Sequence, residues 1–424
     1  MELQCSVQNY AWGKRGSHSI IAELLESSDP EFTPKLDERY AELWMGTHPS
    51  GPATCKATNV KLAEYIASNG PAKILGEACV REFGDTEQLP FLFKVLSVDK
   101  ALSIQVHPNK KQAEALHAAR PNVYKDPNHK PELAVALTRF EALCGFRPIA
   151  EIQSYVKSIP ELRACIAGGE PGSGGGGGSS ELEALLSSSD EDTQRQALRR
   201  CFASLMSHDK SCVAREQKKF LARLTGEDSE SRRVLQAELF ERLHEDYPGD
   251  IGCFVVYFLN YLVLEPGEAI YLRANEVHAY LSGDCVECMA CSDNVVRAGL
   301  TPKLIDVETL VDVASFASAP ADAKTFQPQA DDDGDEYSQV WRPDEPDFAL
   351  AKISLPYNLE YSTRPRPSAS ILLVAQGCLE ARVDGRDRFV ARGTSVFLAA
   401  GEVLTIKTNA NEPVLIYQAF ANVS

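Results

Sequence analysis

The sequence predicts a mainly β protein with two jelly-roll barrels or sandwiches and an inserted α-helical domain. Three observations lead to this fold class. Strand-like runs fill residues 1–150 and return over residues 251–320. Between them, residues 151–250 carry apolar side chains every three or four positions, the period of amphipathic helices. Residues 321–424 show short strands at even spacing with Gly and Asp turns, the pattern of a jelly roll.

Two separated segments make up the first predicted β domain. FLFKVL at 91–96 and ALSIQV at 101–106 have the composition and alternation of strands, and LAEYIASN at 62–69 predicts a short helix. The segment LEPGEAIYLRANEVHAYLSG, at 264–283, contains a turn, a strand, a tight connection and a second strand. This layout resembles the second conserved motif of cupin barrels. We therefore assign residues 1–150 and 251–320 to one cupin-like domain.

The helical insertion is predicted from an absence of helix breakers. Between Glu181 and Tyr247 there is no proline and one glycine, Gly226. A Gly/Ser tract at 168–180 comes before the helices. It is not a phosphate-binding loop, because the GK[ST] ending and the preceding strand are missing. A flexible surface linker is the better interpretation.

The C-terminal region, 321–424, is predicted to be a second cupin-like jelly roll. It contains no histidine, so it cannot repeat a histidine metal site, and we interpret it as a duplicate without chemistry. The acidic run DDDGDE at 331–336 has the wrong register for a calcium-binding EF-hand loop, since Gln329 and Val340 would take its first and last ligand positions. We predict a solvated loop between domains there.

Composition limits the classes of partner. A formal net charge of -17 argues against binding to nucleic acid or to an anionic membrane. No stretch approaches the roughly 18 apolar residues of a membrane span, and the N-terminus does not resemble a signal peptide. The 424 residues are 44% hydrophobic, which is enough for two or three domains with full cores. We expect a cytoplasmic, monomeric protein.

The 12 cysteines show no disulfide framework, as in reducing compartments. Cys285, Cys288 and Cys291 form the one close group. A structural zinc site normally has four ligands in two spaced pairs, whereas these three stand alone in an apolar stretch. We interpret them as small buried hydrophobic residues with free thiols.

Four residues in three apolar segments predict a metal site. Gln105 and His107 are two apart, so in a strand they share a face with each other and with Ser103. The same spacing puts Lys130 beside Glu132, and Tyr280 beside His278. Gln105, His107, Glu132 and His278 are nitrogen and oxygen ligands with one carboxylate, and such a set suits a divalent cation such as zinc.

These segments also resemble a known family, type I mannose-6-phosphate isomerase (phosphomannose isomerase). The resemblance covers most of the chain and is most specific in four stretches: QNYAWGKRGSHSIIAELL, YAELWMGTHPSGPA, the long run from LPFLFKVLSVDK to EALCGFRP, and the run from VVYFLNYLVLEPGEA to LIDVETLV. All four predicted ligands lie within it. The middle and the C-terminal third match less distinctly.

The resemblance implies an activity. The expected enzyme is an aldose–ketose isomerase with one Zn²⁺ per chain, which interconverts D-mannose 6-phosphate and D-fructose 6-phosphate through an enediolate and feeds GDP-mannose synthesis. Zinc would serve as the electrophile. With one anionic ligand the site keeps a charge near +1, which preserves Lewis acidity.

The resemblance also implies further site residues. Arg297 is marked most strongly as catalytic, and Glu287 is the leading candidate for the base. Lys130 is expected to move protons at the sugar oxygens. Ser103, Arg297 and Lys303 would hold the phosphate, since a guanidinium can bind such an anion through two donors. Asp293 is interpreted as a residue that orients Arg297.

Two other functions are compatible with a metal-binding cupin. One is a metal-dependent oxygenase, but such sites usually combine two or three histidines and a carboxylate around iron, and Gln105 does not fit that pattern. The other is a non-catalytic sugar-binding cupin, which would have no reason to gather Lys130, Glu287, Arg297 and Lys303 around a metal.

Overall fold

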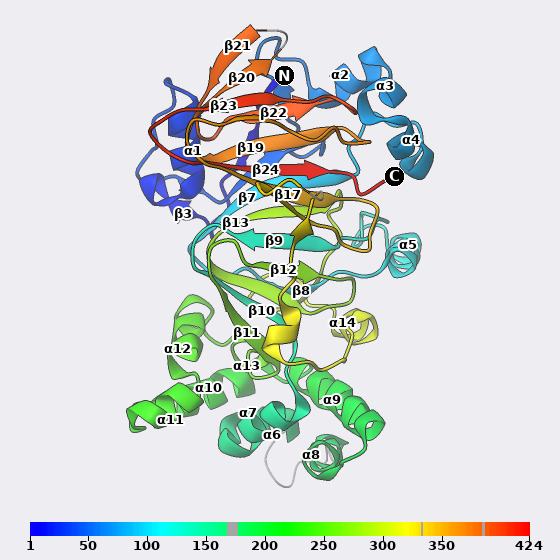
Figure 1. Cartoon of the computed structure of the whole chain (residues 1–424). Helices are drawn as coiled ribbons and strands as arrows, with labels where there is room; N and C mark the ends of the chain where they lie inside the picture. The colour runs from blue at the N-terminus through cyan, green and yellow to red at the C-terminus, as the bar shows by residue number, and fades with distance from the viewer. Residues whose placement is uncertain (168–176, 332–333, 384–385) are drawn as a thin grey trace.

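The computed structural model describes residues 1–167, 177–331, 334–383 and 386–424. Most of the Gly/Ser tract that we interpret as a linker lies outside the described residues. Strands fill the upper and middle parts of the molecule, and the helices of the mid-chain lie together at the lower end (Figure 1). Both termini lie in the upper part of the molecule.

The N-terminal third alternates short strands and short helices. Its strands are β1 (Glu2–Gln4), β2 (Ser6–Gln8), β3 (Lys14–Arg15), β4 (Arg39–Tyr40), β5 (Glu42–Met45), β6 (Thr54–Cys55), β7 (Phe91–Val98), β8 (Ile104–Val106), β9 (Glu132–Ala136) and β10 (Phe140–Phe146). Its helices are η1 (Gly16–His18), α1 (Ile20–Ser28), α2 (Leu62–Asn69), α3 (Pro71–Leu75), α4 (Glu77–Phe83) and α5 (Lys110–Ala119). The strand predicted at 91–96 and the helix predicted at 62–69 are confirmed as β7 and α2.

A ten-stranded antiparallel sheet combines β2, β5, β7, β8, β9 and β10 with later strands. The later strands are β11 (Leu259–Leu264), β12 (Ala269–Leu272), β13 (His278–Ala290) and β14 (Val296–Gly299). The long strand β13 pairs with β8 and β10 near its start and with β7 and β9 along the rest of its length. Every residue of β7, β9 and β10 is buried, so both faces of this sheet are covered.

Helices occupy the stretch where the sequence predicts them. They are α6 (Ile149–Ser158), α7 (Pro160–Ala167), α8 (Gly177–Ser187), α9 (Glu191–Met206), α10 (Lys210–Leu224), α11 (Ser229–Val234), α12 (Ala237–Asp246) and α13 (Gly252–Val255). Asp190, Asp209 and Asp228 cap three of them by accepting backbone N–H groups. Their apolar faces enclose a cluster that includes the fully buried Phe202 and Phe220. Within the described residues, no helix has the length and apolarity needed to cross a bilayer.

The C-terminal region is again built mainly from strands. The elements are α14 (Val307–Val313), η2 (Ala321–Lys324), β15 (Gln329–Ala330), β16 (Ser338–Trp341), β17 (Ala349–Leu355), β18 (Glu360–Ser362), β19 (Ser370–Gln376), β20 (Leu379–Val383), β21 (Arg386–Val390), β22 (Ser395–Leu398), β23 (Thr405–Thr408) and β24 (Val414–Phe420). An eight-stranded and a four-stranded antiparallel sheet contribute residues such as Leu372, Ile406 and Ile416 to one apolar cluster. This is the two-sheet layout that the even strand spacing predicts.

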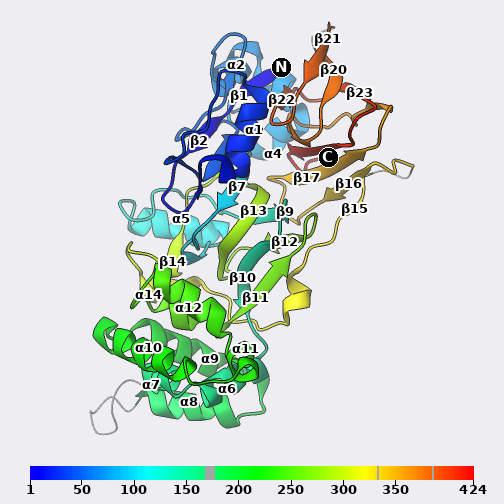
Figure 2. The ribbon, with the colours of Figure 1, turned by 90° about the vertical axis from the view of Figure 1, so that its left-hand side faces the viewer.

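The two ends of the chain share a sheet. β1 pairs with β22, with Glu2 opposite Val396, and β6 continues the same sheet beyond β1. Figure 2 shows this contact between the first strand and the late strands. The sequence analysis assigned all of residues 1–150 to the first β domain, whereas β1 and β6 extend the sheet of the C-terminal strands.

The interpretation of the acidic run as a solvated loop is wrong for its first member. Asp331 is only 8% exposed, and the guanidinium of Arg366 binds it through two nitrogens. Asp332 and Asp333 lie outside the described residues. A run of acidic residues in the sequence does not indicate which of them pairs with a buried arginine.

Candidate metal centre

The ends of three strands bring together three of the predicted ligands. Glu132 is the first residue of β9, His278 is the first residue of β13, and His107 directly follows β8. In the pairing of β13 with β8, His278 lies opposite Gln105. Segments far apart in the sequence therefore meet at one point of the ten-stranded sheet.

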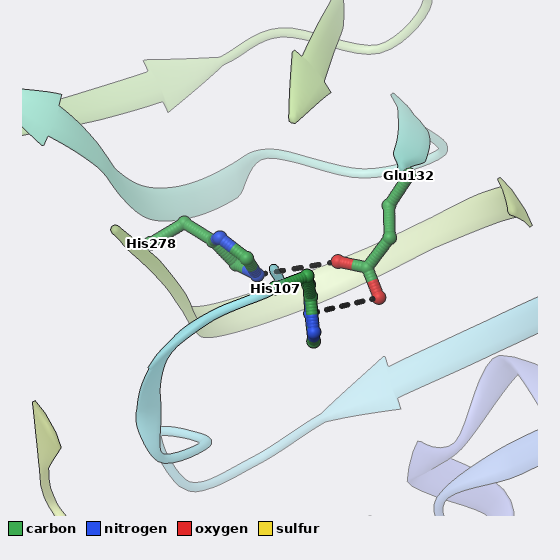
Figure 3. A group of neighbouring side chains, drawn as sticks. All are labelled: His107, Glu132 and His278. Atoms are coloured by element: carbon green, nitrogen blue, oxygen red, sulfur yellow. Dashed lines mark ion pairs between the residues drawn. The ribbon is translucent and has the colours of Figure 1, made fainter. Parts of the chain in front are cut away.

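The two imidazoles face the two oxygens of one carboxylate (Figure 3). His107 Nε2 lies 3.5 Å from Glu132 Oε1, and His278 Nε2 lies 3.2 Å from Glu132 Oε2. The ring centroids of the histidines are 5.0 Å apart. All three side chains are buried, with exposures of 1–2%. Their ligand atoms are close enough together to bind one ion.

Backbone carbonyls fix the orientation of both histidine rings. His107 Nδ1 donates to the carbonyl of Asn294 at 2.6 Å, and His278 Nδ1 donates to the carbonyl of Glu276 at 2.8 Å. A carbonyl accepts only from a protonated nitrogen, so Nδ1 carries the hydrogen in each ring. This leaves Nε2 of each ring facing Glu132. This is the usual outer support of a metal-binding histidine.

The charges in the group favour a bound cation. Burial lowers the pKa of His107 to about 4, so its ring is neutral at pH 7. Burial alone would raise the pKa of Glu132, but the positive charge of the nearby Lys130 holds it well below its usual range, so the carboxylate is ionised. The lone pair of His107 Nε2 thus faces the lone pairs of the Glu132 carboxylate. Among the described residues, neither His107 Nε2 nor Glu132 Oε2 has a hydrogen-bond partner.

Gln105 lies at the edge of the group. Its amide Nε2 is 3.5 Å from His278 Nε2, and the side chain is half-buried. A half-turn of the amide about its last bond presents Oε1, an acceptor, to the same point. Together the four residues offer neutral nitrogen and oxygen ligands and one carboxylate, a ligand set that suits zinc.

Lys130 is the cation closest to the group. Its Nζ lies 3.1 Å from Glu132 Oε1, and the lysine side chain retains 14% exposure. The structure therefore brings together Lys130 and Glu132, as their spacing predicts. Since the amine borders both the buried carboxylate and solvent, it is suitably located to donate or accept a proton.

Glu287 lies in a buried network next to this group. Its Oε1 accepts from the Tyr280 hydroxyl at 2.8 Å, and its Oε2 pairs with Lys94 Nζ at 3.1 Å. Burial raises the pKa of Glu287, and the charge of Glu132 adds to the rise, although Lys94 opposes it. Both carboxylate oxygens are thus occupied, which the sequence alone does not predict.

Lys94 is a member of this network that is not among the predicted site residues. It lies in β7 directly opposite Glu287 in β13, and its Nζ is also 3.8 Å from Glu42 Oε2. The ring of Trp44 lies beside it, with the centroid 5.2 Å from Nζ. A visible signal existed, because Lys94 is a charge in the middle of the apolar run FLFKVL.

Arg297 and Lys303 line the same hollow, which has a volume of about 440 Å³. Arg297 lies on β14 opposite Gln105, and the lining of the hollow includes Asn294, whose carbonyl accepts from His107. Burial lowers the pKa of Arg297, and among the described residues no carboxylate pairs with it. Lys303 is exposed. The hollow therefore offers two basic side chains to an anion.

Two predicted roles near this hollow are less well placed. Ser103 is half-buried and is not among the residues that line the hollow with Arg297 and Lys303. Asp293, which was expected to orient Arg297, lies 3.4 Å from His48 Nε2 instead. Ser103 precedes β8, so it does not continue the alternation on which its prediction depends.

A second group of possible ligands was not predicted. His129 Nε2 lies 3.0 Å from Asp347 Oδ2, and His129 Nδ1 lies 3.9 Å from Glu345 Oε2. This is the other group among the described residues with metal-ligand geometry. It differs from the first because each ring nitrogen of His129 already faces its own carboxylate. This arrangement is typical of a histidine that links two chain segments.

The three clustered cysteines point into different surroundings. Cys285 and Cys288 are fully buried on β13, in two separate apolar clusters. Residues three apart in a strand lie on opposite faces, so these thiols cannot share an ion. Burial raises the pKa of Cys291 to about 12, which keeps that thiol protonated.

Family models match two parts of the chain. Residues 1–149 match the model described as phosphomannose isomerase type I, catalytic domain, and residues 177–259 match its helical insertion domain. A mannose-6-phosphate isomerase from Mus musculus is 44% identical over 425 residues, with 98% of this chain and 97% of that protein covered. One from Candida albicans is 43% identical over 74% of this chain and 72% of its own length.

Solved structures are similar over the whole chain. A phosphomannose isomerase mutant from Salmonella typhimurium superposes with a TM-score of 0.81 at 33% identity, covering 100% of this chain and 99% of that one. A mannose 6-phosphate isomerase bound with zinc and yttrium gives a TM-score of 0.81 at 32% identity with the same coverage.

Proposed function

Because the chain belongs to the type I phosphomannose isomerase family and is therefore an isomerase, we propose that it interconverts D-mannose 6-phosphate and D-fructose 6-phosphate with the help of zinc. Gln105, His107, Glu132 and His278 would hold one zinc ion per chain. The observation that supports this most directly is that His107 Nε2 and Glu132 Oε2 are buried side by side without a hydrogen-bond partner among the described residues. Zinc, when bound, supplies a Lewis acid that polarises the sugar carbonyl.

The reaction transfers a proton between C1 and C2 of the open-chain sugar. Glu287 is the proposed acceptor of that carbon-bound proton, because burial raises its pKa toward the range in which a carboxylate works as a base. Its two donors, Lys94 and Tyr280, hold the carboxylate in one orientation. Lys130, at the border of the group, would exchange protons with the sugar oxygens while the enediolate forms.

The phosphate would bind in the hollow beside the metal group. Arg297 has no carboxylate partner among the described residues, so its donor fork is available to an anionic substrate. Lys303 adds a second charge from the rim of the hollow. Ser103 remains part of the proposed clamp through its hydroxyl, but it lies outside the lining of the hollow.

Both alternative functions have less support. A non-catalytic sugar-binding cupin conflicts with membership in an isomerase family, and so does an oxygenase. We also propose that the reaction supplies mannose 6-phosphate for GDP-mannose synthesis, in keeping with the family resemblance.

The experiment is an assay of fructose 6-phosphate formation by the purified chain, together with elemental analysis. We expect zinc in the protein, turnover of mannose 6-phosphate, and loss of turnover in a chelator with recovery when zinc is added. Glucose 6-phosphate, which differs from mannose 6-phosphate at C2, is the substrate control. Turnover that persists in demonstrably metal-free protein would contradict the zinc dependence.

A further inference from the structure

We propose that Asp250, in the turn before α13, is a positioning residue that holds the Leu300–Lys303 segment at the edge of the substrate hollow. This inference rests on the proposed function, in which Lys303 meets the phosphate. Asp250 belongs to the helical part of the chain, and its side chain reaches across to the segment that follows β14.

One carboxylate accepts three backbone N–H groups here. Asp250 Oδ1 accepts from Leu300 at 2.7 Å and from Gly252 at 2.7 Å, and Oδ2 accepts from Thr301 at 3.1 Å. Two of these donors belong to the segment that carries Lys303. Hydrogen bonds to a charged acceptor are stronger than neutral ones, so the carboxylate fixes where the segment leaves the sheet.

The segment adopts a backbone conformation that needs such support. Leu300 has φ +50°, a left-handed conformation that residues with a branched side chain rarely adopt. It packs directly on the turn, since a Cβ added to Gly252 would lie 2.5 Å from the Leu300 nitrogen. Strained residues of this kind persist only where the surroundings determine them, and they gather at functional sites.

The helical core in turn holds Asp250. Gln217 of α10 is fully buried; its Nε2 donates to the Asp250 carbonyl at 2.7 Å, and its Oε1 accepts from the Gly249 N–H at 3.0 Å. His244 of α12 lies 3.1 Å from the same amide oxygen. A continuous chain of contacts therefore links α10 and α12 to the segment that carries Lys303.

The segment separates two hollows. Lys303 and the 68% exposed Leu304 line the hollow of Arg297, and they also line a second hollow of about 530 Å³ next to Met206 and His208. Asp306 fastens the far end by accepting from the Tyr124 hydroxyl at 2.8 Å. With both ends tied, the position of Lys303 depends on these two carboxylates.

The test compares the zinc-loaded full chains of Asp250→Ala, Asp250→Asn and wild type. For Asp250→Ala we expect the KM for mannose 6-phosphate and the Ki for inorganic phosphate to rise together about tenfold, with kcat changed less than about threefold, because a misplaced lysine weakens phosphate binding in ground and transition states alike. Asp250→Asn, which keeps one acceptor oxygen, should give a smaller rise in both.

Asp190→Ala is the matched control. Asp190 also accepts a backbone N–H in the helical part, from Thr193 at 2.8 Å, but it caps α9 and does not contact the Lys303 segment. It should lower thermal stability without changing KM. If Asp250→Ala and Asp250→Asn change KM no more than Asp190→Ala does, the proposal is wrong.

A double-mutant cycle with Lys303→Ala completes the test. If Asp250 acts through Lys303, the double variant should bind inorganic phosphate no more weakly than Lys303→Ala alone. Additive losses would overturn the proposal. Failure of the proposed function is a separate outcome, because it would appear as a wild-type chain that does not isomerise mannose 6-phosphate at all.

Discussion

Two buried polar groups in this molecule differ in whether their hydrogen bonds are complete. In the ten-stranded sheet, His107 Nε2 and Glu132 Oε2 are buried without a hydrogen-bond partner among the described residues. In the C-terminal region, the Asp331 carboxylate accepts two hydrogen bonds from the Arg366 guanidinium, at 2.8 and 2.5 Å. The first group requires something from outside the chain, whereas the second is complete.

The hydrogen bonds of the C-terminal group, Asp331 and Arg366, extend to further side chains. Arg366 also donates to Gln418 Oε1 at 3.2 Å, and Gln418 Nε2 donates to Ser370 Oγ at 3.0 Å. The guanidinium lies over the ring of Phe420, 4.1 Å from its centroid. Since a lone buried charge is costly, such completeness indicates a structural role. Incomplete hydrogen bonding, more than burial or charge, therefore distinguishes the group of His107, Glu132 and His278 from this structural one.

The largest expected effect comes from removing a ligand. His278→Ala should lower kcat by about a thousandfold or more, because zinc supplies several kcal/mol of transition-state stabilisation and is bound poorly by the remaining ligands. His107→Ala should behave alike. Zinc content and kcat are measured on the same preparations. Normal zinc content with normal turnover in either variant would remove these residues from the site.

Arg297→Lys should have the next largest effect. Lysine keeps the charge but loses the planar fork, so we expect kcat/KM to fall about ten- to several-hundred-fold at roughly 1.5–3 kcal/mol per charged hydrogen bond. Zinc content and melting temperature should not change. We expect the fall to lie mainly in kcat, because the family resemblance implies that Arg297 lies beside the reacting carbons as well as near the phosphate. Wild-type kinetics would show that Arg297 does not touch the reacting anion.

Arg366→Met should lower stability and leave activity unchanged, because the pair of Arg366 and Asp331 is structural. Removing one partner from a buried pair typically costs about 3–5 kcal/mol of unfolding free energy, while kcat per bound zinc should be unchanged. Urea unfolding measures the loss. Arg382→Met, at an exposed arginine paired with Asp387, is the control and should change stability by about 0.5 kcal/mol or less. A lower kcat in folded Arg366→Met would mean that the two regions are coupled.

The same pair predicts a pH dependence. Burial by itself would raise the pKa of Asp331, but the hydrogen bonds and charge of Arg366 lower it below the usual 3.8. A carboxylate with a lowered folded pKa contributes stability that is complete above about pH 4 and is lost as the pH falls through that lowered value. Asp331→Asn should therefore lack this part of the acid dependence in melting curves between pH 5 and 2.

The smallest effect on zinc binding and turnover is expected from the clustered cysteines. Replacing Cys285, Cys288 and Cys291 together with serine should cost about 1–3 kcal/mol per buried hydroxyl and leave the zinc stoichiometry unchanged. The measurement is zinc per folded chain, with folding checked by circular dichroism. A clear loss of zinc from the folded variant would refute the interpretation of these thiols as structural.

Local features of the site were predictable from the sequence. Lys130 and Glu132 are two apart, and the structure brings their charged atoms to 3.1 Å. The meeting of His107, Glu132 and His278 was predictable through the family resemblance, because periodicity says nothing about which distant strands pair. The helices of the mid-chain followed from their period and from the lack of proline.

Contacts that depend on register were not predictable. Lys94 meets Glu287 because β7 and β13 pair with those residues opposite each other, and no local pattern sets that register. Asp331 is buried because Arg366, far along the chain, approaches it. Ser103 lies one residue before β8 and does not line the hollow, and its proposed role in binding the phosphate stays a prediction.

The central claim is that the incomplete group of His107, Glu132 and His278 holds the zinc that isomerisation requires. The most direct test is to titrate metal-free protein with zinc while recording fructose 6-phosphate formation. We predict that activity rises in proportion to bound zinc and stops rising at one equivalent per chain. Full activity before any zinc is added would contradict the account. So would activity that needs a second equivalent, since this would bring His129, Glu345 and Asp347 into the reaction.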